Sequence, residues 1–416
     1  MSRADSITAQ DLVGEQGFVD RGYPHDAWRV LREEEPLRYF DLGERPGFWA
    51  VVRRADIVWI SKQPERFLNA PRLAVFPDSP GRQRDGSRQP IVRHLLNMDP
   101  PEHARYRSMA SSWFTPRAIE RRRPEIERIS RALLDGLVGR EQIDFVGDYT
   151  APLTLSVLAD MLGVPREDWR RLFEWTNQMA GPSDPEYQLS ANPSDSMRAT
   201  TGEMFEYFGG MVAERRRKPG DDIVSVLAGA EIDGKPIPPF ELLSFLTLLV
   251  VAGNETTRNA ASGGLMAMIE RPEALETLRR HPGLIGRATE ETIRWTSPVI
   301  QFCRTAAEDV ERNGRMIRKG DSLCLFYPSA NRDAEVFEAP DEFRIDRSPN
   351  PHVGFGIGEH FCLGANLARL EIRIALEQLA SRIDRVELAG PVERVRSSFL
   401  GGMKRMPLRM ELKPAD

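Results

Sequence analysis

Residues 355–364 read Phe355-Gly356-Ile357-Gly358-Glu359-His360-Phe361-Cys362-Leu363-Gly364. After this cysteine, leucine and isoleucine recur at helical spacing, which predicts that Cys362 lies in a glycine-bent loop at a helix N-terminus. Free backbone N–H groups there would stabilise a thiolate, and the missing glycine side chains would let a large flat group approach. A lone free cysteine is more often a packing residue, so the stretch alone predicts only a candidate metal-binding thiol.

A second polar motif interrupts the apolar helix expected over residues 239–270. Ala252-Gly253-Asn254-Glu255-Thr256-Thr257 places a glycine and a carboxylate at its centre. The glycine costs ~1 kcal/mol relative to alanine, and a buried carboxylate costs more. Ala252 and Thr256 are four residues apart and share one face, so a small side chain lies beside a hydroxyl. A closely packed helix with Glu255 on a solvated side would explain the same residues.

Composition and charge narrow the class of protein. The 416 residues are 41% hydrophobic and carry a net charge of -5, which disfavours general nucleic-acid binding. No linker or repeat divides the chain, so we expect one domain over residues 1–416. The three cysteines have no paired metal-ligand spacing, which suits a reducing compartment. The N-terminus has no signal pattern and no apolar run approaches the roughly 20 residues of a membrane span, so we predict a cytoplasmic protein.

The pattern Phe-Gly-any-Gly-any-His-any-Cys-any-Gly resembles the haem-binding loop of the cytochrome P450 family. The resemblance implies a mainly α-helical fold with small β-sheets, in which haem b lies between the long central helix and the helix after the cysteine loop. It also implies that Cys362 is the axial iron ligand, a ligation that favours O–O cleavage. Thr256 and Glu255 are the implied catalytic pair, a hydroxyl near the activated oxygen and an acid on its proton route.

The resemblance extends to three further groups of residues. The implied haem contacts, besides the cysteine, are His103, Arg107, Ala252, Gly253, Arg304, Phe355, Gly356, His360 and Gly364. The implied substrate contacts are Leu248, Val251, Ile300, Gln301, Phe302, Phe399 and Leu400. The implied structural pair behind the cysteine loop is Glu291 and Arg294. A third basic partner is usual in the family, but Glu342 stands at its place here, which leaves Arg344 and Arg347 as candidates.

Several expectations concern the rest of the chain. We expect an amphipathic helix over residues 26–40 and a short strand over 47–52. The polar, breaker-rich loop over 77–86 is a candidate pocket lid. Two helices over 166–180 and 194–217 flank a proline-bearing connection, and the resemblance suggests that this pair opens and closes the active site.

The implied activity is that of a monooxygenase that hydroxylates or epoxidises an apolar small molecule, namely a steroid, terpenoid or aliphatic compound, with O2. The three cysteines cannot bind an iron–sulfur cluster, so two electrons are expected from a separate ferredoxin and its NAD(P)H-dependent reductase. This partner is expected to dock near Arg107 and Arg369. A peroxide-driven peroxygenase and a non-catalytic haem-binding recruitment module are the alternatives.

Overall fold

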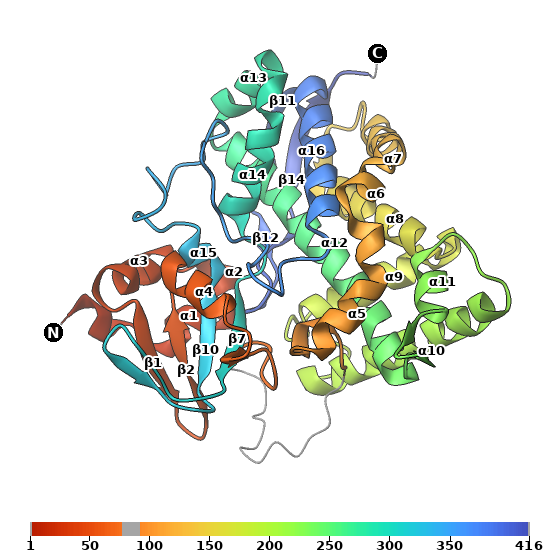
Figure 1. The fold of residues 1–416 in the computed structure, drawn as a ribbon. Coiled ribbons are helices and arrows are strands. Elements are labelled where there is room, and N and C mark those ends of the chain that lie inside the picture. The colour runs from red at the N-terminus through yellow and green to blue at the C-terminus, as the bar shows by residue number, and fades with distance from the viewer. Residues whose placement is uncertain (1, 77–91, 415–416) are drawn as a thin grey trace.

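The computed structural model describes residues 2–76 and 92–414. Helices make up most of the molecule, and a mixed sheet with the N-terminal helices forms one side of it (Figure 1). The predicted fold, mainly α with small sheets, is confirmed. The helices are α1 (Ala9–Val13), α2 (Glu15–Arg21), α3 (His25–Glu34), α4 (Arg54–Ser61), α5 (Glu102–Ser111), α6 (Pro116–Glu120), α7 (Arg123–Asp135), α8 (Ala151–Leu162), α9 (Trp169–Ala180), α10 (Pro193–Arg217), α11 (Ile223–Ala228), α12 (Pro239–Ile269), α13 (Pro272–Arg280), α14 (Ile285–Thr296), α15 (Tyr327–Ala330) and α16 (Ala365–Arg382).

The largest described sheet has the strand order β1-β2-β10-β7-β3, and the next has the order β11-β14-β4. Within the first sheet only β2 and β10 run parallel. The remaining strands form two-stranded hairpins or ribbons. The strands are β1 (Leu37–Leu42), β2 (Arg45–Val51), β3 (Phe67–Leu68), β4 (Gln142–Asp144), β5 (Glu231–Ile232), β6 (Lys235–Pro236), β7 (Gln301–Ala306), β8 (Val310–Arg312), β9 (Arg315–Ile317), β10 (Ser322–Phe326), β11 (Ile383–Leu388), β12 (Glu393–Arg394), β13 (Met403–Arg405) and β14 (Pro407–Leu412).

The helix expected over residues 26–40 is wrong in its second half. The helix α3 ends at Glu34, and Leu37–Leu42 is strand β1, paired antiparallel with β2. Pro36 follows the helix end, and a proline disfavours helical backbone at the residue before it. The apolar residues after Pro36 therefore form a strand of the sheet instead of another helical turn.

The central helix α12 begins at Pro239 as predicted and ends at Ile269, one residue earlier than expected. Its buried polar residues have partners on neighbouring helices. Asn254 accepts from Thr154 Oγ1 at 2.6 Å and donates to Thr176 Oγ1 at 2.8 Å, which offsets the cost of burying its amide. Neither α12 nor any other helix within residues 2–76 and 92–414 is long and apolar enough to cross a membrane.

The expected helix pair forms, as α9 and α10, but the predicted lid loop over 77–86 lies outside the described residues. The two helices contact each other, and both contact α12. The connection between them therefore joins two elements that lie directly on the central helix.

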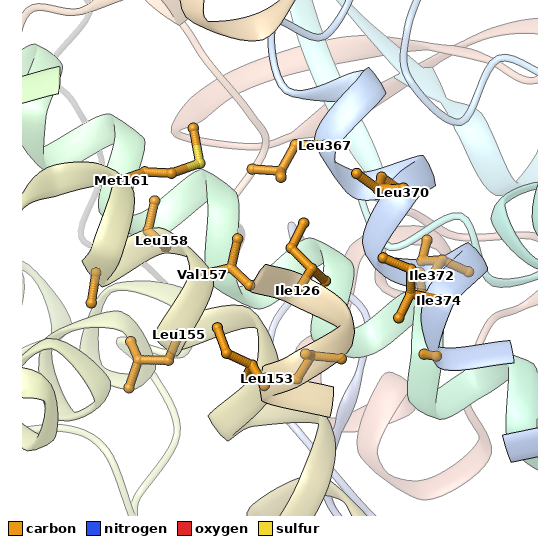
Figure 2. Close-up of a cluster of buried hydrophobic side chains, with 14 of the residues drawn as sticks. Ile126, Leu153, Leu155, Val157, Leu158, Met161, Leu367, Leu370, Ile372 and Ile374 are labelled. Atoms are coloured by element: carbon orange, nitrogen blue, oxygen red, sulfur yellow. The ribbon is translucent and has the colours of Figure 1, made fainter. Parts of the chain in front are cut away.

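One part of the main core lies between α7, α8 and α16. The helix α7 packs against both α8 and α16, and Figure 2 shows Ile126 of α7 among Leu153 and Val157 of α8 and Ile374 of α16. A buried leucine or isoleucine contributes about 1.5–3 kcal/mol. This packing fixes the helix that follows the cysteine loop.

Candidate active site

The cysteine loop has the left-handed bends that its glycines allow. Gly356 and Gly358 have φ angles of 68° and 80°, which side chains with a Cβ rarely adopt. A Cβ on Gly358 would lie 2.2 Å from the carbonyl oxygen of Ser61, so that glycine serves packing against the end of α4. Cys362 donates its N–H to Phe355 O at 2.9 Å, three residues before α16 begins.

The thiol of Cys362 is exposed, unlike the other two cysteines of the chain. Protein atoms nevertheless lie close around its sulfur. Burial raises the pKa of Cys362, and the backbone of Gly364 with the charges of Arg107 and Arg369 offsets only part of that rise. The loop therefore does not favour a thiolate by itself, contrary to our prediction. A bound metal ion would supply that effect, because a coordinating thiol loses its proton.

The middle of α12 presents a small exposed patch. Ala252 is exposed and Thr256 partly exposed, although most of this helix is buried. Thr256 Oγ1 donates to Ala252 O at 2.8 Å, so its lone pairs are left for a donor on the exposed side. Gly253 is also partly exposed, and a Cβ there would lie 3.2 Å from Leu158 of α8. Its missing side chain allows the two helices to approach.

Glu255 is completely buried and not on a solvated side. It forms an ion pair with Arg258, whose Nη1 donates to Asn177 Oδ1 of α9 at 2.9 Å. Its other oxygen, Oε1, has no hydrogen-bond partner among the described residues. Burial raises the pKa of Glu255, and the charge of Arg258 offsets part of the rise. A buried carboxyl with a raised pKa is a candidate proton carrier.

Two histidines and two arginines expected at one edge of the cofactor come from three parts of the chain. The rings of His103 and His360 have centroids 3.9 Å apart. His103 is 1% exposed, and its Nε2 has no partner in the described part of the chain. Arg107 on α5 is partly buried and Arg304 on β7 is buried, and neither is ion-paired with a carboxylate among the described residues. Buried cations without anions predict an anionic ligand.

The predicted pair behind the loop forms. Arg294 donates to both oxygens of Glu291 at 2.8 Å, with both side chains fully buried. The third partner is Arg347, whose Nε donates to Glu291 Oε2 at 3.0 Å. Arg344 contributes only its backbone N–H, at 2.7 Å. Both buried arginines also donate to backbone carbonyls within residues 338–342, which holds the segment before the cysteine loop.

A second network was missed by the sequence analysis. Glu290 accepts from Arg369 of α16 at 2.7 and 2.9 Å and lies 3.1 Å from His352 Nε2. Although burial acts in the opposite direction, His352 and Arg369 lower the pKa of Glu290 to about 2. No local pattern joins these three positions. Glu290 neutralises the charge of Arg369. Arg369 therefore contributes less to the expected basic docking face than the sequence suggests.

The candidate pocket residues that remain partly exposed are aromatic or aliphatic. Phe302 of β7 and Phe399 contact edge to face with centroids 5.4 Å apart, and Phe76 contacts Phe399 at 5.9 Å. These three rings form an aromatic trio, of which Phe76 was not predicted because it carries no motif. Val251 of α12 is partly exposed, and Leu248, one turn before it, is 9% exposed.

Three of the predicted substrate contacts are buried among protein atoms. Ile300 is fully buried in the N-terminal core cluster. Gln301 is fully buried, and its amide bonds both backbone groups of Val75, at 3.0 and 2.9 Å, and the carbonyl of Ser398 at 3.1 Å. An amide with all these partners is a structural clamp. Leu400 is also buried, at an isolated bridge to Val299.

The residues present fit a haem. The exposed thiol of Cys362 would hold the iron, and Ala252 and Gly364 leave room beside it, since nothing lies within 4 Å of a Cβ placed on Gly364. The unpartnered His103 Nε2 and the two unpaired arginines would meet carboxylates of the cofactor. This donor set, on a mainly helical fold, defines a haem-thiolate enzyme.

Comparison with known proteins agrees with this class. The cytochrome P450 family model matches residues 284–385. The chain is 36% identical to cytochrome P450-terp of Pseudomonas sp over 413 residues, covering 96% of both chains. It is 37% identical to linalool 8-monooxygenase of Pseudomonas putida, covering 92% of this chain and 94% of that one. The crystal structure of CYP108D1 from Novosphingobium aromaticivorans matches with a TM-score of 0.87 and 33% identity, covering 99% of this chain and 100% of that chain.

The chain belongs to the cytochrome P450 family and is a P450 monooxygenase. The predicted family and enzyme class are therefore confirmed, and with them a haem cofactor.

Proposed function

We propose that this enzyme inserts one oxygen atom of O2 into an apolar small molecule of the terpenoid, steroid or aliphatic class, with haem b held by Cys362. The observation that carries the proposal is the exposed Cys362 before α16 together with the exposed Ala252 and partly exposed Thr256 of α12, a helix that packs against α16. The bound cofactor supplies dioxygen activation, and its thiolate ligand favours O–O cleavage.

Residues of the chain itself would bind and transfer protons next to the cofactor. Thr256 Oγ1, whose proton is committed to Ala252 O, accepts a hydrogen bond from the reacting group and so orients it. Glu255 is the proposed proton carrier, because its Oε1 has no hydrogen-bond partner among the described residues and burial raises its pKa. Its other oxygen pairs with Arg258, which in turn donates to Asn177 of α9.

The substrate class follows from the remaining pocket candidates. The aromatic trio, Leu248 and Val251 are all apolar, so a ligand lying against them gains burial energy but no charged anchor. Relatives named linalool 8-monooxygenase and steroid C26-monooxygenase, at 37% and 38% identity, support the terpenoid and steroid classes. Two electrons come from a ferredoxin and its NAD(P)H-dependent reductase, because the three cysteines of the chain cannot hold a cluster.

The ligand assignment is tested by Cys362→Ser with Cys324→Ser as the matched control. Cys324 is buried and donates to Gln301 Oε1, a bond that serine can also make. We expect the strongly red-shifted Soret band of the reduced carbon-monoxide complex in the wild type and in Cys324→Ser only. Retention of that band in Cys362→Ser would sink the assignment.

The substrate class is tested by spectral titration with linalool, a steroid and a long-chain fatty acid. We expect the linalool-type compound to shift the Soret band at the lowest concentration. Turnover with the ferredoxin system and with peroxide is then compared on the same compound. Faster turnover with peroxide would replace the monooxygenase proposal with the peroxygenase alternative.

A further inference from the structure

His103 is held between two different partners. Its Nδ1 lies 3.1 Å from Glu359 Oε1, a carboxylate of the cysteine loop. Its Nε2 is buried and has no partner among the described residues. Its ring lies against that of His360. Glu359 occupies one of the unassigned positions of the loop pattern.

The contact with Glu359 fixes what Nε2 can do. An ionised carboxylate only accepts hydrogen bonds, so Nδ1 must carry the hydrogen of that contact. A neutral imidazole has one N–H, which leaves Nε2 as an acceptor. Two acceptors repel, so Nε2 can meet a carboxylate of the haem only when His103 carries both protons.

We propose that Glu359 is a positioning residue that keeps His103 doubly protonated, so that Nε2–H donates to a haem carboxylate. This inference rests on the proposed haem site. The imidazolium then lies between two carboxylates, and each anion stabilises it. Without the cofactor, burial lowers the pKa of His103 and Glu359 counters it. Haem binding therefore takes up a proton at His103.

The other charged groups around His103 do not replace Glu359. Arg107, one turn along α5, disfavours a second positive charge, and Asp99 favours it more weakly than Glu359 does. Asp99 is already engaged by the backbone N–H groups of Asn69 and Ala70, at 2.6 and 3.2 Å. Asn69 Nδ2 lies 2.7 Å from His360 Nε2, which fixes the second ring without adding charge. Glu359 is thus the carboxylate that decides the protonation of His103.

The test uses Glu359→Gln, whose amide oxygen still accepts from Nδ1–H but carries no charge. The holoprotein is labelled with ¹⁵N-histidine and studied as the diamagnetic reduced carbon-monoxide complex. The chain has six histidines, so the His103 signals are assigned by their loss in His103→Gln. We expect both ring nitrogens protonated at pH 7 in the wild type. In Glu359→Gln the proton affinity of His103 falls on the order of tenfold, one pH unit.

A second readout measures cofactor retention. Haem transfer to excess apomyoglobin at pH 7 should be several-fold faster from Glu359→Gln than from the wild type. The matched control is Glu102→Gln, since Glu102 is next to His103 but pairs with Arg93 at 2.7 Å. A wild-type His103 that is neutral, or protonated only at Nε2, overturns the inference, as does an unchanged titration in Glu359→Gln. If the wild type does not bind haem, the proposed function is wrong, and this inference is wrong with it.

Discussion

Replacing Gly358 by alanine tests whether packing of the cysteine loop against α4 holds the site together. The new Cβ would lie 2.2 Å from the Ser61 carbonyl oxygen, and a backbone atom at a helix end cannot rotate away. Left-handed backbone alone costs an alanine about 1–2 kcal/mol. Displacing a packed neighbour adds about 1–3 kcal/mol. We therefore expect Gly358→Ala to lower the free energy of unfolding by about 2–5 kcal/mol.

Gly356→Ala is the matched control, because Gly356 has a similar φ angle of 68° while the nearest atom to its Cβ is 3.7 Å away. This variant should lose only the conformational part, about 1–2 kcal/mol. Urea denaturation of the two holoproteins at equal haem content, followed by far-ultraviolet circular dichroism and by the Soret band, gives the comparison. If the two variants agree within about 0.5 kcal/mol, the contact with Ser61 does not limit the loop and the reasoning is wrong.

Three further predictions follow from other parts of the molecule. Thr256→Ala should uncouple NAD(P)H and O2 consumption from product with release of peroxide, while Thr256→Ser stays coupled; equal coupling in both would remove the hydroxyl from the proton route. Glu371 of α16 is 2% exposed with an unpartnered Oε2 among the described residues, and burial raises its pKa well above the usual value. Because the folded state keeps this proton after the unfolded state loses it, stability should fall by up to about 1.4 kcal/mol per pH unit above about pH 4.3, until the folded pKa is passed. Urea curves of Glu371→Gln at several pH values should lack this part of the slope, and parallel behaviour of the two proteins would refute it. Arg347→Met leaves Glu291 without one buried partner and should cost about 3 kcal/mol, whereas Arg344→Met should change stability by less than about 0.5 kcal/mol; similar losses in thermal melts would contradict the assignment of the third partner.

Patterns that depend on local periodicity were predictable from the sequence. The central helix was located within one residue, because a long apolar segment with a proline start has few alternatives. The i,i+3 spacing of Glu291 and Arg294 allows an ion pair, but its place behind the cysteine loop was implied only by the family resemblance. The sequence does not decide between Arg344 and Arg347 as the third partner. Both residues follow an irregular segment whose path is set by its carbonyl contacts.

Other features of the site depend on contacts between distant parts of the chain. Gln301 looks like a pocket residue on an exposed strand until Val75 and Ser398 are brought against it. The pKa of Cys362 rises because the folded chain crowds the thiol, an effect that helix-end reasoning does not contain. Phe76 and the partners of Glu290 likewise follow only from the tertiary structure.

The amide of Gln301 has a consequence for how this enzyme can change its substrate. It bonds Val75, Ser398 and the thiol of Cys324, and so ties together the backbone segments that carry the three rings of the aromatic trio. Side chains on such a frame can be exchanged without moving the frame. If the trio lines the pocket as proposed, single substitutions at the ring positions would change substrate preference, whereas substitution of the buried glutamine would disturb all three segments at once.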